Sequence, residues 1–294
     1  MNHRRYRIIG VAALLTLGVV ACSPGAARPA SHAPASHAPT SHAPASHAPA
    51  SASVGDGPAT DFPTVPPGRE LPSGAQCARM VRARPGTEIR PGNGRANHTT
   101  GQPVGPGLFP RGDSPQAAAL APLISGDFTG TTQQILEWAA CKWGISQEVV
   151  FAQAAAESSW DQSHASDWGT DPALCPPGHG LGTDGMSGQC PESYGILQTK
   201  YTQWHAAWPA IGDSTAMNAD VTYAIWRSCF DGNEVWLNNS ATPAHPYRPG
   251  DLWGCVGRWF AGRWYTPGAE GYIQRVQHLL AERVWEQPGF ISGG

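Results

Sequence analysis

The sequence predicts a mainly α-helical folded head with long Gly/Pro-rich loops, preceded by a disordered tether. From Thr131 onward, capping residues precede runs in which apolar residues recur at helical spacing. No run of alternating apolar and polar residues, the sign of a half-buried strand, stands out in the sequence. The length of 294 residues suffices for one large or two small domains.

The first 21 residues have the pattern of a bacterial signal peptide. The basic stretch MNHRRYR precedes the apolar run IIGVAALLTLGVV, which is too short to span a bilayer comfortably. Cys22 follows small residues in VVAC, as in a lipobox, so we expect removal of residues 1–21 and lipidation of Cys22. A plain secretory cut before Cys22 is the alternative. We therefore expect an exported protein, lipid-anchored to a bacterial membrane.

The mature chain carries a net negative charge. The whole chain has 19 Lys and Arg side chains and 22 Asp and Glu side chains, and the signal peptide removes three arginines and no acid. The mature chain thus keeps 16 basic against 22 acidic side chains, a net charge of −6. Nucleic-acid binders normally present a basic face, so we expect no nucleic-acid partner.

Residues 22–70 are predicted to form the tether. The segment SHAPASHAPTSHAPASHAPA repeats a five-residue unit four times. Ser, Ala and Pro at this density cannot bury enough apolar surface to offset the entropy lost on ordering. The prolines favour an extended chain, which would let the head reach away from the membrane. Residues 71–130 remain Gly/Pro-rich and are predicted to be an irregular lead-in that packs on the head.

Six cysteines remain when Cys22 is set aside, and an even number in an exported chain predicts three disulfides. Fifteen pairings are possible. We favour Cys175–Cys190 across a Gly/Pro-rich loop, Cys229–Cys255, and Cys77–Cys141. A zinc site is the competing interpretation, because Cys175, His179 and Cys190 lie close in sequence. The paired CxxC arrangement is missing, so we predict no metal and no cofactor.

The head, residues 131–288, begins with two predicted helices. The stretch TTQQ offers Thr131 as N-cap with Gln134 in a capping box, and Gly144 can end this helix. Ser146 is the predicted cap of the second helix, which runs through VVFAQAAAES to Glu157.

A long Gly/Pro-rich loop near residues 165–192 separates these helices from three more. Ser214 opens the next helix, and Asp251 opens another in GDLWGCVGRWF. The last predicted helix runs from about Ala269 and is stopped by Pro288.

Glu157 is the candidate catalytic residue. It follows Val150 by seven positions and Gln153 by four, so it lies on or beside the inward face of its helix. Partial burial and the negative end of the helix dipole would both raise its pKa. A glutamate that stays protonated near neutral pH is suited to general acid catalysis. The alternative is an ordinary exposed glutamate at a frayed helix end.

Four motifs follow one another along the head. ESSW ends the second helix, ESYGILQT spans residues 192–199, MNADVTYAIW follows, and WFAGRWYTPGAEGYIQRV comes last. This order resembles the lytic transglycosylases with a soluble-transglycosylase domain, which are relatives of goose-type lysozyme. The resemblance covers roughly Thr131 to Trp285. It implies a lysozyme-like α-helical domain, glycan strands of peptidoglycan as the partner, and a location facing the cell wall.

The resemblance also implies roles for individual residues. Glu157 would be the sole catalytic acid/base. The turn Gly195–Gln198 would line the sugar cleft, with Gln198 placed to hydrogen-bond substrate. Asn218 would buttress the cleft, and Tyr272 would lie close to the catalytic glutamate. We count both, with Gly195 and Gln198, among the expected substrate-binding residues.

Three positions depart from the family pattern. Tyr194, which we also place among the substrate-binding residues, precedes the glycine turn where serine is frequent. Trp259 and Phe260 stand where tyrosine and asparagine are common. These departures affect the description of one cleft wall and leave the acid in place. Flat indoles such as Trp160, Trp204 and Trp259 could stack on sugar rings. Of the twelve tryptophans we expect most in the core and two or three in the cleft, without assigning which.

One marked carboxylate favours an intramolecular reaction over hydrolysis. Most glycosidases use two carboxylates, but Asp161, Asp167, Asp171 and Asp184 carry no motif. With a single acid/base, the N-acetyl group of the substrate can assist, and the sugar's own C6 hydroxyl can then attack C1. The expected product is a 1,6-anhydro-N-acetylmuramic acid end. The alternatives are a goose-type lysozyme-like hydrolase, a non-catalytic wall-binding lipoprotein, and a lipoprotein that serves only as scaffold or adhesin.

Overall fold

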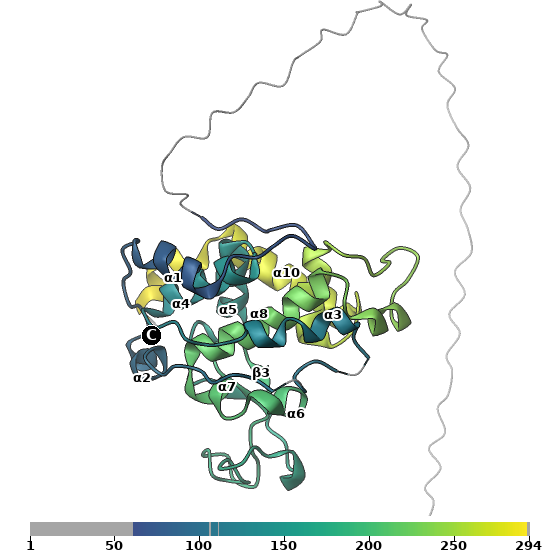
Figure 1. Cartoon of the computed structure of the whole chain (residues 1–294). Coiled ribbons are helices and arrows are strands. Elements are labelled where there is room, and N and C mark those ends of the chain that lie inside the picture. Colours follow the sequence, from purple (N-terminus) through teal and green to yellow (C-terminus); the bar gives the residue numbers. More distant parts are fainter. Residues whose placement is uncertain (1–60, 106, 111, 293–294) are drawn as a thin grey trace, which may run out of the picture. The chain divides into compact units, whose positions relative to one another are not determined.

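The computed structural model describes residues 61–105, 107–110 and 112–292 (Figure 1). The predicted signal peptide, Cys22 and most of the predicted tether therefore lie outside the described residues. The described part belongs to one compact unit, Asp56–Gly294. It is mainly helical, which confirms the predicted fold class. Within these residues, every helix is too short or too polar to cross a membrane.

The elements of the described residues have the following bounds. The α-helices are α1 (Gly74–Arg82), α2 (Gly94–Asn97), α3 (Pro115–Ala118), α4 (Thr132–Trp143), α5 (Gln147–Ser158), α6 (Tyr201–Trp204), α7 (Ala210–Asp213), α8 (Thr215–Phe230), α9 (Leu252–Ala261), α10 (Pro267–Ala281) and α11 (Pro288–Ser292). Single 3-10 turns span Pro91–Asn93, Ala121–Leu123, Pro172–Leu174, His205–Ala207, Val235–Asn239 and Val284–Glu286. The strands are β1 (Ala165–Ser166), β2 (Ser193–Tyr194) and β3 (Thr199–Lys200).

Helix α8 forms the centre of the core. All of its residues are buried, and α4 and α9 pack against it, while α10 packs against both α5 and α9 (Figure 1). The Oγ of Ser214 accepts the amide hydrogen of Met217 at 3.2 Å, so Ser214 opens α8 as predicted. Asp251 caps α9 in the same manner through Gly254. The central position of α8 leaves it without an exposed face.

The caps of α4 agree with the sequence, whereas that of α5 differs. Thr131 and Gln134 form the predicted capping box, and Gly144 ends α4 in the left-handed conformation. Ser146 precedes α5 as expected, but its side chain makes no cap hydrogen bond. Its backbone N–H instead donates a hydrogen bond to the hydroxyl of Thr64. The chain that precedes the head thus contributes to this junction.

The prediction that Pro288 stops the last helix is wrong. Helix α10 ends at Ala281, and Arg283 then adopts the left-handed conformation (φ 44°), which breaks the helical path. Pro288 instead opens the short helix α11. Proline at the first helical position loses nothing, because the amide at that position has no partner within the helix.

Part of the predicted tether is ordered. The segment 61–70 runs along the head, where Val65 N–H donates to the Gly144 carbonyl at 2.9 Å. The buried guanidinium of Arg227 donates to the carbonyls of Val65 and Pro66 at 2.8 and 2.9 Å. Phe62 also packs against the core. Apolar residues such as Phe62 and Val65 give this stretch a surface to bury that the Ser/Ala/Pro repeat lacks.

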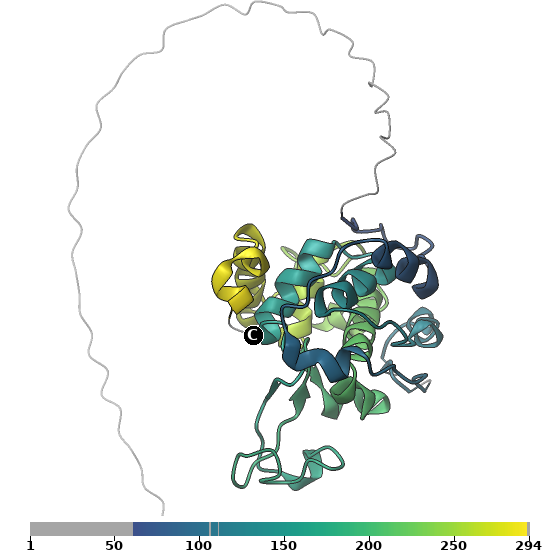
Figure 2. The same ribbon diagram turned by 90° about the vertical axis from the view of Figure 1, so that its left-hand side faces the viewer.

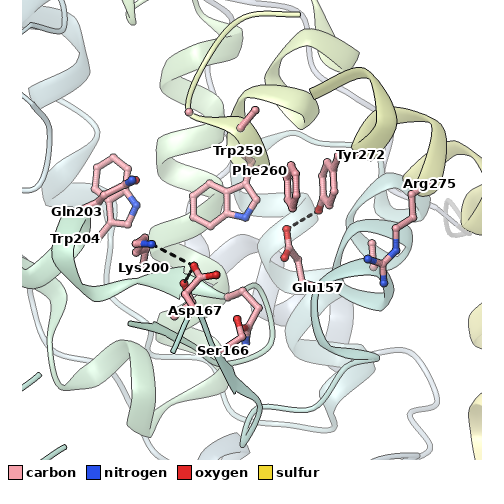
Figure 3. Close-up of a pocket in the computed structure, with 15 residues that line it drawn as sticks. Glu157, Ser166, Asp167, Lys200, Gln203, Trp204, Trp259, Phe260, Tyr272 and Arg275 are labelled. Carbon is pink, nitrogen blue, oxygen red and sulfur yellow. Dashed lines mark hydrogen bonds and ion pairs between the residues drawn. The ribbon is translucent and has the colours of Figure 1, made fainter. Parts of the chain in front are cut away.

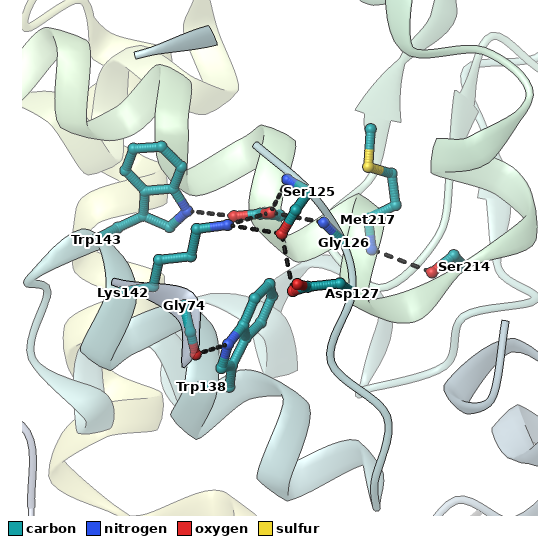
Figure 4. Close-up of polar contacts among 10 residues, drawn as sticks. Gly74, Ser125, Gly126, Asp127, Trp138, Lys142, Trp143, Ser214 and Met217 are labelled. Atoms are coloured by element: carbon teal, nitrogen blue, oxygen red, sulfur yellow. Dashed lines mark hydrogen bonds and ion pairs between the residues drawn. The ribbon is translucent and has the colours of Figure 1, made fainter. Parts of the chain in front are cut away.

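The lead-in, residues 71–130, is more regular than predicted. It contains α1, which begins with a capping box of Ser73 and Gln76 and packs against α4. At the C-terminal end of the lead-in, a buried polar cluster joins it to the head (Figure 4). Asp220 of α8 accepts hydrogen bonds from the amides of Ser125 and Gly126 at 2.8 and 2.9 Å. Lys142 Nζ and Trp143 Nε1 donate to the same carboxylate at 2.6 and 2.7 Å.

All three favoured disulfide pairings are confirmed. Cys77–Cys141 joins α1 to α4, Cys229–Cys255 joins α8 to α9, and Cys175–Cys190 closes the loop between β1 and β2. With Cys175 and Cys190 bonded to each other, the competing zinc site loses both of its thiolates. Figure 2 shows the loop between β1 and β2 projecting away from the helices.

The structure contains a small antiparallel sheet that the sequence pattern does not indicate. Its strand order is β1-β2-β3, and its register pairs Ser166 with Ser193 and Ser193 with Lys200. Each strand has only two residues, too few to produce a visible alternation. Residues that pair across a sheet share one face, so Ser166, Ser193 and Lys200 lie on the same side. That side faces the cleft described next.

Candidate active site

A cleft of about 500 Å³ opens at the C-terminal end of α5, between the small sheet and helices α9 and α10 (Figure 3). Its lining comes from five separate parts of the chain. The residues are Ala156, Glu157, Ser166, Asp167, Ser193, Gln198, Lys200, Gln203, Trp204, Trp259, Phe260, Ala261, Gly262, Tyr272 and Arg275. Both the helix that carries Glu157 and the turn after β2 therefore meet at one cavity.

Glu157 is a half-buried carboxyl group next to the hydroxyl of Tyr272. The hydroxyl of Tyr272 donates to Glu157 Oε1 at 2.5 Å. The pKa of Glu157 is raised to about 7, mainly by burial and in smaller part by the charge of Asp167, while Tyr272 and Arg275 oppose the rise. The sequence predicts this direction from burial, so the prediction is confirmed. Glu157 is consequently poised between its acid and base forms near neutral pH.

The small residues of α5 explain how Tyr272 comes so close. Ala152, Ala155 and Ala156 are buried, and α10 packs directly against α5. Alanines permit a close approach of two helices, because no long side chain separates the backbones. Glu157 is the last long side chain on this surface before Ser159 turns the chain into the left-handed conformation. The alanine stripe thus brings the hydroxyl of Tyr272 onto the carboxyl group.

Tyr272 is itself held on two sides. The ring of Phe260 stacks on it with centroids 4.8 Å apart and an interplanar angle of 4°. Behind it, the fully buried Gln153 lies near enough to lower the pKa of its hydroxyl, against the stronger raising effect of burial. Burial raises the pKa of Tyr223 of α8, the charge of Glu157 adds to this rise, and the Tyr223 hydroxyl donates to the Val150 carbonyl at 3.3 Å. The hydroxyl of Tyr272 therefore acts as a fixed donor to Glu157.

The glycine turn is shaped by Asn218. Gly195 has φ +82°, and a methyl group there would overlap the Nδ2 atom of Asn218 and lie 2.7 Å from Gln162 Nε2. Asn218 accepts the amide hydrogen of Leu197 at 3.0 Å and donates to the carbonyl of Tyr194 at 2.8 Å. Asn218 is fully buried, so it supports the turn, as the resemblance implies. It lies outside the cleft lining, which differs from its expected place among the substrate-binding residues.

Gln198 lines the cleft, but its amide is engaged by the protein. Its Oε1 accepts from the hydroxyl of Ser166 at 2.5 Å, and its Nε2 donates to the carbonyls of His164 and Gly195 at 3.0 and 2.8 Å. Gln198 thus lies at the cleft, as predicted, whereas Gly195, Ile196 and Leu197 of the same turn are not part of its described lining. Its hydrogen bonds tie the glycine turn to β1.

Tyr194, predicted among the substrate-binding residues, lies outside the cleft. Its hydroxyl donates to the Pro191 carbonyl at 2.9 Å, and its ring packs against His179 and Trp208 in a separate cavity. The reason is the period of a strand, in which neighbours point to opposite faces. Ser193 occupies the cleft side of β2, and Tyr194 takes the other side.

Of the four loop aspartates, Asp167 reaches the cleft in the described structure. It accepts from the Ser193 hydroxyl at 2.7 Å and pairs with Lys200 Nζ at 3.3 Å. Asp161 and Asp184 line the separate cavity, and Asp171 caps a 3-10 turn. Figure 3 shows Asp167 and Lys200 on the opposite side of Glu157 from Arg275.

Sequence reasoning missed Lys200 and Arg275 and left Asp167 unassigned. Lys200 follows the glycine turn directly, and Arg275 follows Tyr272 by three positions, so helical spacing alone would place it on the face of Tyr272. Trp204 and Trp259 line the cleft, in agreement with the expected two or three tryptophans, whereas Trp160 is fully buried in the core.

Comparisons of the chain with models of known families, with curated proteins and with solved structures find no match. The functional argument therefore rests on the chemistry of the cleft.

Proposed function

We propose that this protein is a peptidoglycan lytic transglycosylase. It would cleave the β-1,4 bond between N-acetylmuramic acid and N-acetylglucosamine and leave 1,6-anhydro-N-acetylmuramic acid ends. The observation that carries the proposal is a carboxyl group with a pKa of about 7, hydrogen-bonded by Tyr272 and facing an open cleft. A single acid/base at this pKa suits a reaction in which one group first gives and then takes a proton.

The proposed reaction uses Glu157 twice. Protonated Glu157 donates its proton to the glycosidic oxygen as the bond to C1 breaks, while the substrate's N-acetyl group stabilises C1. Glu157, now a carboxylate that accepts from Tyr272, removes the proton of the C6 hydroxyl as this oxygen attacks C1. Water is not consumed, and Glu157 ends in its starting form.

The direct test is the Glu157→Gln variant on purified peptidoglycan. Glutamine preserves the shape of the side chain and removes the titrating proton, so turnover should fall by about 10²- to 10⁴-fold, the usual contribution of general acid–base catalysis. Turnover retained within about tenfold would place the acid elsewhere. Mass analysis of the products from the unmodified protein should find ends that weigh one water less than reducing ends and that resist borohydride.

A goose-type lysozyme-like hydrolase is the second candidate, and the position of Asp167 favours it. This carboxylate lines the same cleft as Glu157 and raises its pKa. It could hold a water for attack on C1, as the second carboxylate of hydrolysing glycosidases does. Ordinary reducing ends in the products would decide for this candidate. The Asp167→Asn variant should then lose activity, whereas Asp171→Asn, a control in the exposed loop, should not.

Non-catalytic wall-binding and scaffold functions make the opposite prediction. Neither requires a proton donor, so gels containing peptidoglycan should show no clearing, and Glu157→Gln should change nothing.

We further propose that the protein is anchored to a bacterial membrane through Cys22 and faces the cell wall. Cys22→Ala should release it from membranes, and continued membrane association of this variant would contradict the anchor.

A further inference from the structure

Arg275 is a cation in the cleft that the fold leaves unpaired. It is exposed, lines the same cavity as Glu157, and makes no hydrogen bond or ion pair with another residue of the described chain. Its charge acts on Glu157, whose pKa it lowers. A guanidinium stays charged at any relevant pH and offers five donors. The cleft therefore presents a positive group that a bound molecule can neutralise.

The other cation of the cleft differs in this respect. Lys200 Nζ lies 3.3 Å from a carboxylate oxygen of Asp167 and 3.3 Å from one of Glu192. Two acids already neutralise it, so it has little charge to offer an anion. The two cations also lie on different sides of Glu157 (Figure 3). An anionic group of a ligand is thus expected on the α10 side of the cleft.

Helix α10 places Arg275 next to an apolar surface. Tyr272 and Arg275 are three positions apart, so they share one helix face. Phe260 of α9, a residue that is 59% exposed, stacks against Tyr272. An exposed ring of this size in a cleft provides a contact for an apolar group or a sugar face. The wall made by Phe260, Tyr272 and Arg275 therefore combines apolar contact with a positive charge.

We propose that Arg275 determines specificity by binding a carboxylate carried by the lactyl substituent of N-acetylmuramic acid, with Phe260 covering the adjacent apolar atoms. The proposal rests on the proposed function and names the part of peptidoglycan that this wall recognises. The carboxylate belongs either to the lactyl group itself or to the stem peptide attached to it. A glycan without such a group, such as a β-1,4 polymer of N-acetylglucosamine, would leave Arg275 unpaired.

Binding to the Glu157→Gln variant tests the proposal without catalysis. The ligands are glycan strands freed of stem peptides, the same strands after conversion of their lactyl carboxylates to methyl amides, and strands that keep their peptides. The Glu157→Gln protein should bind one carboxylate-bearing strand about tenfold more tightly than the amidated strand, the scale of one charge-assisted hydrogen bond. Whichever carboxylate-bearing strand shows this gain identifies the source of the anion.

Three further variants in the same background complete the experiment. Glu157→Gln/Arg275→Gln should bind every strand with the affinity that the Glu157→Gln protein has for the amidated strand. Arg275→Lys should keep part of the affinity difference between carboxylate-bearing and amidated strands. Arg263→Gln, which removes an exposed arginine outside the cleft lining, should keep all of it. The proposal would be overturned if the preference for carboxylate-bearing strands survived Arg275→Gln. It would also be overturned if the Glu157→Gln protein bound no strand, or bound all strands equally. Charge-dependent binding by a protein that releases no product would refute the catalytic function alone.

Discussion

Replacement of Glu157 by Gln should stabilise the protein, and by an amount that depends on pH. The glutamine oxygen can still accept the hydroxyl of Tyr272, so the contact at 2.5 Å keeps its donor. What disappears is the cost of holding an ionised carboxylate in a partly desolvated position. The stability difference between variant and unmodified protein therefore reports on the ionisation of this group.

The magnitude follows from the pKa of Glu157. Folding raises it from an ordinary 4.5 to about 7, and each pKa unit corresponds to about 1.36 kcal/mol. Below the ordinary pKa both states are protonated, so the group costs nothing. As pH rises toward 7, the unfolded chain loses the proton first, and folding stability falls. Above pH 7 the full cost of about 3 kcal/mol is present, which the variant avoids.

Thermal unfolding followed by circular dichroism measures this difference. At about pH 8 the Glu157→Gln variant should melt roughly 5–10 °C above the unmodified protein, and at about pH 4 the two should nearly coincide. Glu70→Gln, which neutralises an exposed glutamate far from the cleft lining, should show no such dependence. A melting difference that is equal at both pH values would refute the raised pKa of Glu157.

Three other changes have outcomes that the structure defines. Tyr272→Phe removes the donor that lowers the pKa of Glu157, so the alkaline limit of the pH–activity profile should move upward and activity should fall; an unchanged limit would contradict the hydrogen bond. Gly195→Ala should lower the free energy of unfolding by about 3 kcal/mol, because the added methyl group overlaps Asn218. Gly271→Ala, at a helical glycine with open space around it, should raise the free energy of unfolding by about 1 kcal/mol, and urea unfolding measures both changes. Non-reducing mass spectrometry should detect no free thiol among the six disulfide cysteines, and reduction should lower stability by about 3–4 kcal/mol per bridge.

Local signals in the sequence predicted much of the fold. The capping box at Thr131 and the caps at Ser214 and Asp251 are short-range features, decided by residues within one helical turn. The end of α10 depends on Arg283, for which no local preference indicates a left-handed conformation. The order of residues 61–70 depends on contacts between distant segments, because the carbonyls of Val65 and Pro66 accept hydrogen bonds from Arg227 of α8. No local pattern in the sequence indicates these contacts.

The candidate site was predictable where it depends on one helix and less so where it depends on tertiary contacts. The position of Glu157 at the end of an alanine-rich helix predicts a raised pKa, and only its burial in the fold decides against the alternative of an ordinary exposed glutamate. The side of the sheet on which Tyr194 lies depends on the register of a two-residue strand, which has no pattern to read. Asp167 is similar, since its entry into the cleft requires the pairing of β1 with β2.

The cluster around Asp220 bears on where the chain can be divided. A fragment that starts at Thr131, the beginning of the family resemblance, would lack the amides of Ser125 and Gly126, and Cys141 would lose its disulfide partner. Asp220 would keep Lys142 but lose two of its donors in a fully buried position, which is costly to folding. Recombinant versions of the head should therefore begin near residue 61, upstream of Thr131.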